Sequence, residues 1–291
     1  MAITHVPVMP GEVLEGLNIK DSGIYVDATL GLGGHAELIL QKAKVGALIG
    51  IDRDEAAIES ARERLKDFSN IYFAKESFSN IKAAVSSLGY ETVDGILLDI
   101  GVSTMQLKAE GRGFSFMKDE PLDMRMDKSQ KLSAKEVVNS YHEKDLATLI
   151  FVFGEERFSR KIAKAIVNER RKKRIETCSE LAAIIENSLK GRGRIHPATR
   201  TFQALRIEVN KELDELSAGI TSGADMLNPG GRLCVLSYHS LEDRIVKNAF
   251  KKLASEGIFH IITRKPLVAS RQEIRSNPPS RSAKLRVAER I

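Results

Sequence analysis

The sequence predicts an α/β protein with a doubly wound parallel sheet and an all-helical domain inserted into it. Three observations predict this class: apolar strand-like and helix-like segments alternate over about the first hundred residues, the alternation then breaks, and it resumes near Gly230. Strands that alternate with helices of roughly ten to fifteen residues indicate βαβ units and a parallel sheet. The strands are almost continuously apolar, as in sheets that are covered on both faces.

The first part of the chain contains four expected strands and three expected helices in alternation. The strands are expected at 23–28, 47–51, 70–73 and 93–100, and the helices at 36–44, 54–66 and 80–88. The sheet resumes with a strand at 230–237 and a helix at 241–253. Two last strands are expected at 259–263 and 284–288.

The middle of the chain carries helical signals only. Residues 101–127 read as a long loop, and such a loop inside a compact domain usually serves a function or marks an insertion. Ser133 with Glu136, and Thr177 with Glu180, have the spacing of capping boxes at helix starts. Pro197 suits the first turn of a helix that runs toward Asn210. We therefore expect a sheet domain at 1–105 and 210–291 and a helical substrate domain at 106–209.

Composition narrows the functional classes. The chain has 291 residues, 42% of them hydrophobic, which is enough for one large or two smaller cores. The net charge of +6 and the pI of about 9.2 favour a polyanionic partner. Cys178 and Cys234 share no CxxC spacing, so neither a metal site nor a disulfide framework is predicted. Reduced thiols, no signal peptide and no long apolar run predict a cytoplasmic protein without a membrane span.

A glycine-rich turn at 27–35 (DATLGLGGH) directly follows the first expected strand. Gly31-x-Gly33-x-x-Ala36 satisfies the dinucleotide-binding pattern, but that short pattern is weakly specific. Asp27 discriminates between cofactors, because its carboxylate would repel a pyrophosphate and would suit an ammonium group. The turn, which includes Gly34, is therefore predicted to bind the methionine moiety of S-adenosylmethionine. An oxidoreductase that uses NAD is the alternative.

The ends of the next strands add candidate cofactor ligands at the same sheet edge. Asp52 ends the second strand, where a carboxylate can accept both ribose hydroxyls of either cofactor. Phe78 follows the third strand, where its ring can pack on an adenine, and Asp99 ends the fourth. His35 either contacts the cofactor or only caps the next helix, and the sequence leaves both readings open.

Seven motifs resemble those of the MraW/RsmH family, the 16S ribosomal RNA cytosine-N4 methyltransferases. They occupy 5–17, 27–40, 94–107, 112–127, 200–213, 237–247 and 282–290, nearly the whole chain, in the family's order. The resemblance implies a class I, Rossmann-like methyltransferase domain interrupted by a helical substrate domain. It implies a cytosine of the decoding region as substrate, in position 1402. The cofactor contacts it implies are Gly33, Gly34, His35, Asp52, Phe78, Asp99 and Gln106.

The chemistry of an amino group requires a hydrogen-bond acceptor, because the lone pair of a cytosine N4 is delocalised into the ring. Amino methyltransferases that act on DNA supply it with an Asp/Asn/Ser-Pro-Pro-aromatic turn after the fourth strand. Residues 99–103 (DIGVS) lack both prolines and the aromatic, and the prolines at 277–280 are interpreted as a turn. We expect Asp99 or a neighbouring backbone carbonyl to accept the N4 proton.

A second candidate group ends the fifth large strand, at 237–240 (SYHS). Tyr238 could stack on the base, and His239 could take the released proton because histidine titrates near neutrality. The alternative is a strand end whose polar groups are already satisfied, and both interpretations stay open. No metal is expected, since no cluster of residues has the spacing of metal ligands.

Basic residues concentrate in the middle of the chain and in the tail. Residues 157–174 hold nine Lys or Arg against one acid, and 264–290 hold eight against two. A third run has no acid between its members, which are Lys190, Arg192, Arg194, Arg200 and Arg206. Such runs often form only solvated faces, but three runs in one chain favour a nucleic acid, here the 16S rRNA of the small ribosomal subunit. The alternatives are a non-catalytic ribosome-assembly factor and a methyltransferase of small molecules. The candidate RNA contacts are Arg112, Arg170, Arg171, Lys172, Lys173, Arg174, Arg192, Arg194 and Arg200.

Overall fold

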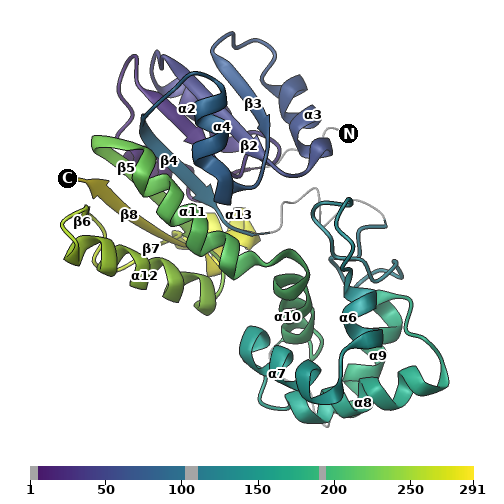
Figure 1. Cartoon of the computed structure of the whole chain (residues 1–291). Coiled ribbons are helices and arrows are strands. Elements are labelled where there is room, and N and C mark those ends of the chain that lie inside the picture. The colour runs from purple at the N-terminus through teal and green to yellow at the C-terminus, as the bar shows by residue number, and fades with distance from the viewer. Residues whose placement is uncertain (1–5, 102–110, 190–194) are drawn as a thin grey trace. The chain divides into compact units, whose positions relative to one another are not determined.

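The chain divides into two compact units in the computed structural model, which describes residues 6–101, 111–189 and 195–291 (Figure 1). One unit comprises Met1–Ser103 and Leu213–Ile291, and the other comprises Thr104–Glu212. The expected limits of the insertion, 106 and 209, lie two and three residues inside the observed limits of the second unit.

The first unit is built on an eight-stranded sheet, which confirms the α/β prediction. The strand order is β3-β2-β1-β4-β5-β8-β6, with β7 paired to β8. Neighbours among β1 to β5 pair in parallel, and β8 pairs antiparallel with β5, β6 and β7. The strand bounds are β1 (Ile24–Asp27), β2 (Ala47–Asp52), β3 (Ile71–Lys75), β4 (Val93–Asp99), β5 (Leu227–Ser237), β6 (Phe259–Ile261), β7 (Leu267–Val268) and β8 (Lys284–Arg290).

Helices cover both faces of this sheet, as the apolar strands predict. One core contains buried residues of α1, α2 and α3, and the other contains buried residues of α4, α11 and α12. Alternate strand residues enter opposite cores: Leu48 packs in the first and Ile49 in the second. The helix bounds are α1 (Pro10–Leu17), α2 (Gly34–Lys42), α3 (Glu55–Arg64), the 3-10 turn η1 (Phe78–Asn80), α4 (Ile81–Ser87), α11 (Glu212–Met226), α12 (Ser240–Ser255), α13 (Arg271–Ser276) and the 3-10 turn η2 (Pro278–Ser282).

Four helices or strands of the first unit were not predicted: α1, α11, β7 and α13. The helix α1 contains two glycines in eight residues, which lowers its intrinsic helix propensity. Tertiary packing stabilises it instead: Gly16 lies so close to β5 and β8 that an added Cβ would stand 2.9 Å from the Cys234 sulfur. β7 and α13 have only two and six residues, too few to show a periodic pattern.

The second unit contains five described helices, and its described residues form no strand beyond an isolated bridge between Pro121 and Thr177. Both predicted capping boxes are present, at Ser133 and Thr177. Both cysteines are buried free thiols. In neither unit does a described helix have the length and apolarity needed to cross a membrane. The helices of the second unit are α6 (Ala134–Ser140), α7 (Glu143–Gly154), α8 (Ser159–Lys172), α9 (Cys178–Ser188) and α10 (Thr199–Asn210).

Candidate active site

Three carboxylates end three neighbouring strands at the point where the strand order reverses. Asp27 of β1 is in register with Gly50 of β2 and Leu97 of β4. Asp52 and Asp99 lie two residues beyond those partners on the same strands, so both carboxylates reach the C-terminal edge next to Asp27. Such a reversal is the usual position of a ligand crevice in an open α/β sheet. The structure thus brings together three of the predicted site residues.

Asp52 holds the glycine-rich turn in place. Its Oδ2 accepts a hydrogen bond from the Gly31 N–H at 2.9 Å, and its Oδ1 accepts one from the Asp54 N–H at 2.9 Å. Gly31 and Gly33 have φ angles of +51° and +74°, a left-handed conformation that favours glycine. Gly33 caps α2 and Gly34 is its first residue. This geometry places the start of α2 at the ends of β1 and β2.

Burial makes negative charge costly at this edge. Asp27 is 1% exposed, and burial raises its pKa to about 7. The charges of Asp99 and Asp52 also raise this pKa, whereas the hydrogen bond from the Thr29 N–H lowers it. Burial likewise raises the pKa of Asp99 to about 6 and also raises the pKa of Asp52. A bound cation would relieve this repulsion and lower all three pKa values. The three carboxylates therefore fit a ligand with positive charge, as predicted from Asp27 alone.

Asp99 is contacted by groups from two other segments, the glycine-rich turn and the residue after β5. Its own N–H donates to the Thr29 hydroxyl at 2.6 Å, and its Oδ1 accepts from the Tyr238 hydroxyl at 2.7 Å. The His35 Nε2 lies 3.6 Å from its Oδ2. Burial and the Asp99 charge raise the pKa of Tyr238 well above its usual value, so that hydroxyl stays a donor. The partners fix the direction in which the Asp99 carboxylate points.

The Tyr238 ring, which was predicted to stack on a base, packs beside Gly101. Gly101, which follows β4 with a φ of +146°, leaves room for that ring, because a Cβ there would stand 3.2 Å from it. The Tyr238 hydroxyl donates its hydrogen bond to Asp99, so Tyr238 contacts the site through that carboxylate. Stacking on a base stays a prediction.

His239 occupies the N-cap of α12. Its Nδ1 accepts from the Glu242 N–H at 3.4 Å, and its Nε2 lies 3.0 Å from the Glu242 Oε1. Glu242 is fully buried and accepts from the Tyr238 N–H at 2.7 Å. These contacts are those of a helix cap and favour the alternative interpretation, although no hydrogen bond with a described residue is found for the His239 Nε2 or the Glu242 Oε1. Glu242 was not among the predicted site residues, although its place three residues after His239 is the capping-box spacing.

The remaining cofactor candidates lie at the rim or outside the described residues. Phe78 opens η1 after β3 and is half-buried, with its ring against Gly219 of α11. Its contact with an adenine stays a prediction. Gln106 lies outside the residues that the structure describes.

Two arginines that were predicted to contact RNA form hydrogen bonds within the second unit. Arg112 is 8% exposed, and its guanidinium donates to the carbonyls of Arg125 and Met126. Arg170 donates to the carbonyls of Val138 and Tyr141 at 2.6 Å each, at the end of α6. The structure gives both side chains a structural role, so neither enters the proposed RNA surface.

Replacing Arg170 with Ala is expected to lower the free energy of unfolding by about 2 to 3 kcal/mol, because two carbonyls lose charged donors. Arg171→Ala, next to it but exposed, is the matched control and should change stability by less than about 0.5 kcal/mol. Urea denaturation of both variants measures the difference. Equal losses would contradict the role given to Arg170.

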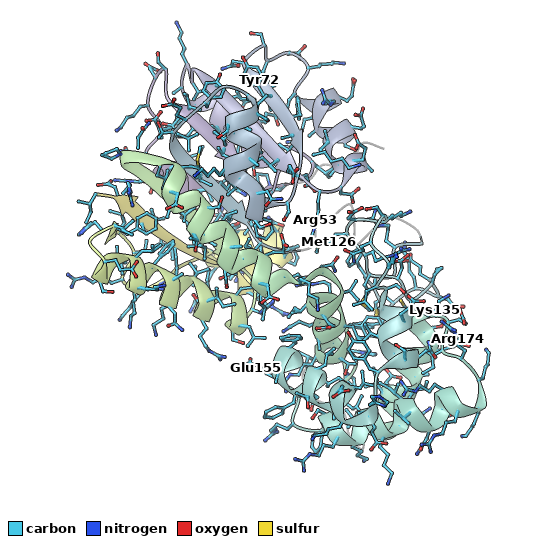
Figure 2. All side chains as sticks on the ribbon, viewed as in Figure 1. Arg53, Tyr72, Met126, Lys135, Glu155 and Arg174 are labelled. Atoms are coloured by element: carbon cyan, nitrogen blue, oxygen red, sulfur yellow. The ribbon has the colours of Figure 1, made fainter. Side chains whose placement is uncertain are left out.

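The other predicted RNA contacts differ in exposure and pairing. Lys172 pairs with Glu169 and Lys173 with Glu180. Arg174 shares Glu176 with Lys135, and Figure 2 labels both cations. Arg200 donates to the Glu155 carbonyl at 3.2 Å, whereas Arg171 is exposed. Arg192 and Arg194 fall in the part of the chain that the structure leaves undescribed.

Comparisons with known proteins find relatives that match over nearly the whole chain. The chain is 52% identical to Ribosomal RNA small subunit methyltransferase H of Persephonella marina, over 99% of this chain and all of that one. It is 47% identical to the protein of the same name from Clostridioides difficile, over the full length of both. Among solved structures, an rRNA methylase from Streptococcus thermophilus matches with a TM-score of 0.47 and 12% identity, over 100% of this chain and 99% of that one.

The sequence profile described as the MraW methylase family matches residues 2–291. A methylase requires a methyl donor, in agreement with the S-adenosylmethionine predicted from Asp27. The match covers both units and every motif on which the predicted resemblance was based. The chain therefore belongs to the MraW methylase family.

Proposed function

We propose that this protein transfers a methyl group from S-adenosylmethionine to the N4 amine of a cytosine in 16S rRNA, at position 1402 of the decoding region. The relatives that match over their full length are named as methyltransferases of small-subunit ribosomal RNA, which supports the substrate. The three carboxylates at the reversal of the sheet carry the proposal, because they favour a cationic cofactor.

The residues present fit S-adenosylmethionine by charge and by position. Asp27 ends β1, and its carboxylate lies near the first turn of α2, where it can pair with the ammonium of the methionine moiety. Asp52 accepts one backbone hydrogen bond on each oxygen and retains lone pairs for ribose hydroxyls. Phe78 offers a half-buried ring for the adenine. When bound, the cofactor supplies a methyl group on a positively charged sulfur.

Asp99 is placed to assist the acceptor amine. In the proposed step the N4 lone pair forms the new N–C bond, the C–S bond breaks, and N4 gives one proton to the Asp99 carboxylate. The Asp99 carboxylate accepts a hydrogen bond from N4 as that proton becomes acidic. Tyr238 holds Asp99 by its hydroxyl, and Thr29 fixes the Asp99 backbone. Tyr238 is thus a positioning residue in this proposal, and His239 supports α12 instead of taking the proton.

Mass mapping of nucleosides tests the proposed reaction. Purified protein is incubated with small ribosomal subunits, or with free 16S rRNA, and methyl-labelled S-adenosylmethionine. N4-methylcytidine at the one expected position would support the proposal. Label on a ring carbon, on another base, or on no RNA of either preparation would contradict it.

Tyr238→Phe is expected to lower kcat about tenfold, because Asp99 loses the donor that orients it. The same hydrogen bond lowers the pKa of Asp99, so its removal should also move the acidic limb of the kcat–pH profile to higher pH. A merely structural role for Tyr238 would leave the position of that limb unchanged. Methyl-transfer assays across pH 5 to 8 measure both effects.

A further inference from the structure

The outward face of α8 carries a row of exposed cations. Its cations recur at helical spacing: Arg160, Lys164 and Arg171 follow one another at intervals of four and seven residues, and Lys161 lies beside them. All are exposed, as is Arg157 just before the helix. We call these five residues the α8 face.

The opposite stripe of α8 is buried, and it includes Ile162, Ile166 and Val167. Arg170 continues that stripe at the spacing of three and four residues, which is why it points inward. Position around the helix therefore separates the cations of α8. The α8 face is exposed, whereas Arg170 points inward and donates to backbone carbonyls of the second unit.

The cations of the α8 face lack protein partners within the described parts of the chain. No hydrogen bond or ion pair joins the side chains of Arg157, Arg160, Lys161, Lys164 or Arg171 to a described residue. By contrast, Lys172 and Lys173 at the end of the same helix pair with glutamates. Five such charges along about 20 Å of chain favour an anionic partner with repeated charges over a merely solvated face.

An apolar corner adjoins the N-terminal end of this face. Phe158 is the N-cap residue of α8 and is 54% exposed. Phe151 and Val152, in the last turn of α7, are 58% and 47% exposed. Exposed large apolar side chains are a common feature of interaction sites. Aromatic rings beside cations suit unpaired nucleotides, whose bases stack on the rings while the cations bind phosphates.

We infer that single-stranded or looped RNA lies along the α8 face, with its phosphates on the cations and an unpaired base on Phe158. This inference rests on the proposed function for the identity of the RNA, and it deepens it by naming a docking surface. It differs from the contacts predicted from sequence, where Arg170 to Arg174 were chosen as one run.

The quadruple variant Arg157→Gln, Arg160→Gln, Lys161→Gln and Lys164→Gln tests the electrostatic part. Fluorescence anisotropy with a labelled hairpin of the decoding region should show RNA affinity at least about tenfold weaker. The slope of log affinity against log salt should flatten by about 2 to 3. The matched control replaces four exposed lysines of the first unit by Gln: Lys42, Lys66, Lys82 and Lys252. An equal loss in the control, or no loss in the α8 variant, would overturn the inference.

Phe158→Ala tests the stacking part. RNA affinity should fall about fivefold or more with an unchanged salt slope, because stacking on an aromatic ring is lost but no charge is. If RNA affinity stayed the same and sedimentation showed that a dimer was lost, the corner would bind a second copy of the chain and the inference would be wrong. RNA binding does not depend on which atom is methylated, so a failure of the N4 proposal alone would leave these results intact.

Discussion

Asp99→Asn is expected to lower kcat by about 10² to 10⁴, the usual effect of removing a positioned proton acceptor. The amide keeps the shape of the side chain, but it is a poor acceptor for the N4 proton. Affinity for S-adenosylmethionine should fall far less than kcat. Single-turnover methyl transfer and calorimetric cofactor binding, measured on the same preparation, separate the two effects.

Asp94→Asn is the matched control on the same strand. Asp94 accepts from the Ile24 N–H at 2.8 Å and from the Asn228 side chain at 3.1 Å, so its role is structural. Its substitution should lower stability and leave kcat within about threefold. Wild-type kcat in Asp99→Asn would remove Asp99 from the mechanism.

The wild-type pH profile provides an independent check on Asp99. Only the ionised carboxylate accepts the proton, so kcat should fall as the pH falls through the Asp99 pKa. That pKa is raised to about 6 by burial in the free protein, and a cationic cofactor would lower it. The acidic limb should therefore lie at or below pH 6, and it should be absent from the residual activity of Asp99→Asn.

Asp27→Asn is expected to weaken cofactor binding about 100-fold, because the ammonium of the methionine moiety loses its buried counter-charge. The amide oxygen can still accept the hydrogen bond from the Thr29 N–H. Affinity is measured by calorimetry at pH 8, where the wild-type carboxyl is mostly ionised. An unchanged affinity would show that this charge does not recognise the cofactor.

The same variant should be more stable than the wild type without ligand. The pKa of Asp27 is raised to about 7 in the folded protein, against 3.8 for an unperturbed aspartate, so the folded state binds the proton more tightly. The carboxyl therefore costs stability increasingly as the pH rises from about 4 to above 7. Asp27→Asn removes that cost and should raise the free energy of unfolding by about 2 to 4 kcal/mol at pH 8. Little difference between the proteins is expected at pH 4.

Local patterns were enough to predict most of the sheet domain. The buried strands are short apolar runs that end in Asp27, Asp52 and Asp99, and parallel pairing brings such ends to one edge. The capping boxes at Ser133 and Thr177 also depend only on residues three apart. Where structure followed from spacing along the chain, the sequence was sufficient.

The contacts that refine the site could not be predicted, because they join distant segments. Tyr238 and Asp99 form a hydrogen bond although 139 residues separate them along the chain. Phe78 likewise packs against Gly219 of α11, which is distant in sequence. Neither pair leaves a periodic signal. The basic run was a different case: Arg170 continues the apolar stripe of α8, so helix phase would have assigned it inside and the α8 face outside.

Proton release on cofactor binding tests the central claim, that repelling buried carboxylates make this a site for a cation. Titrations with S-adenosylmethionine at pH 6.5, in buffers that differ in ionisation enthalpy, count the protons exchanged. An amino group with a pKa of about 7.7 to 8 is then already protonated. Net release of protons by the wild type, much reduced in Asp27→Asn, is the predicted result. Binding without proton release, or equal release by both proteins, would contradict the account.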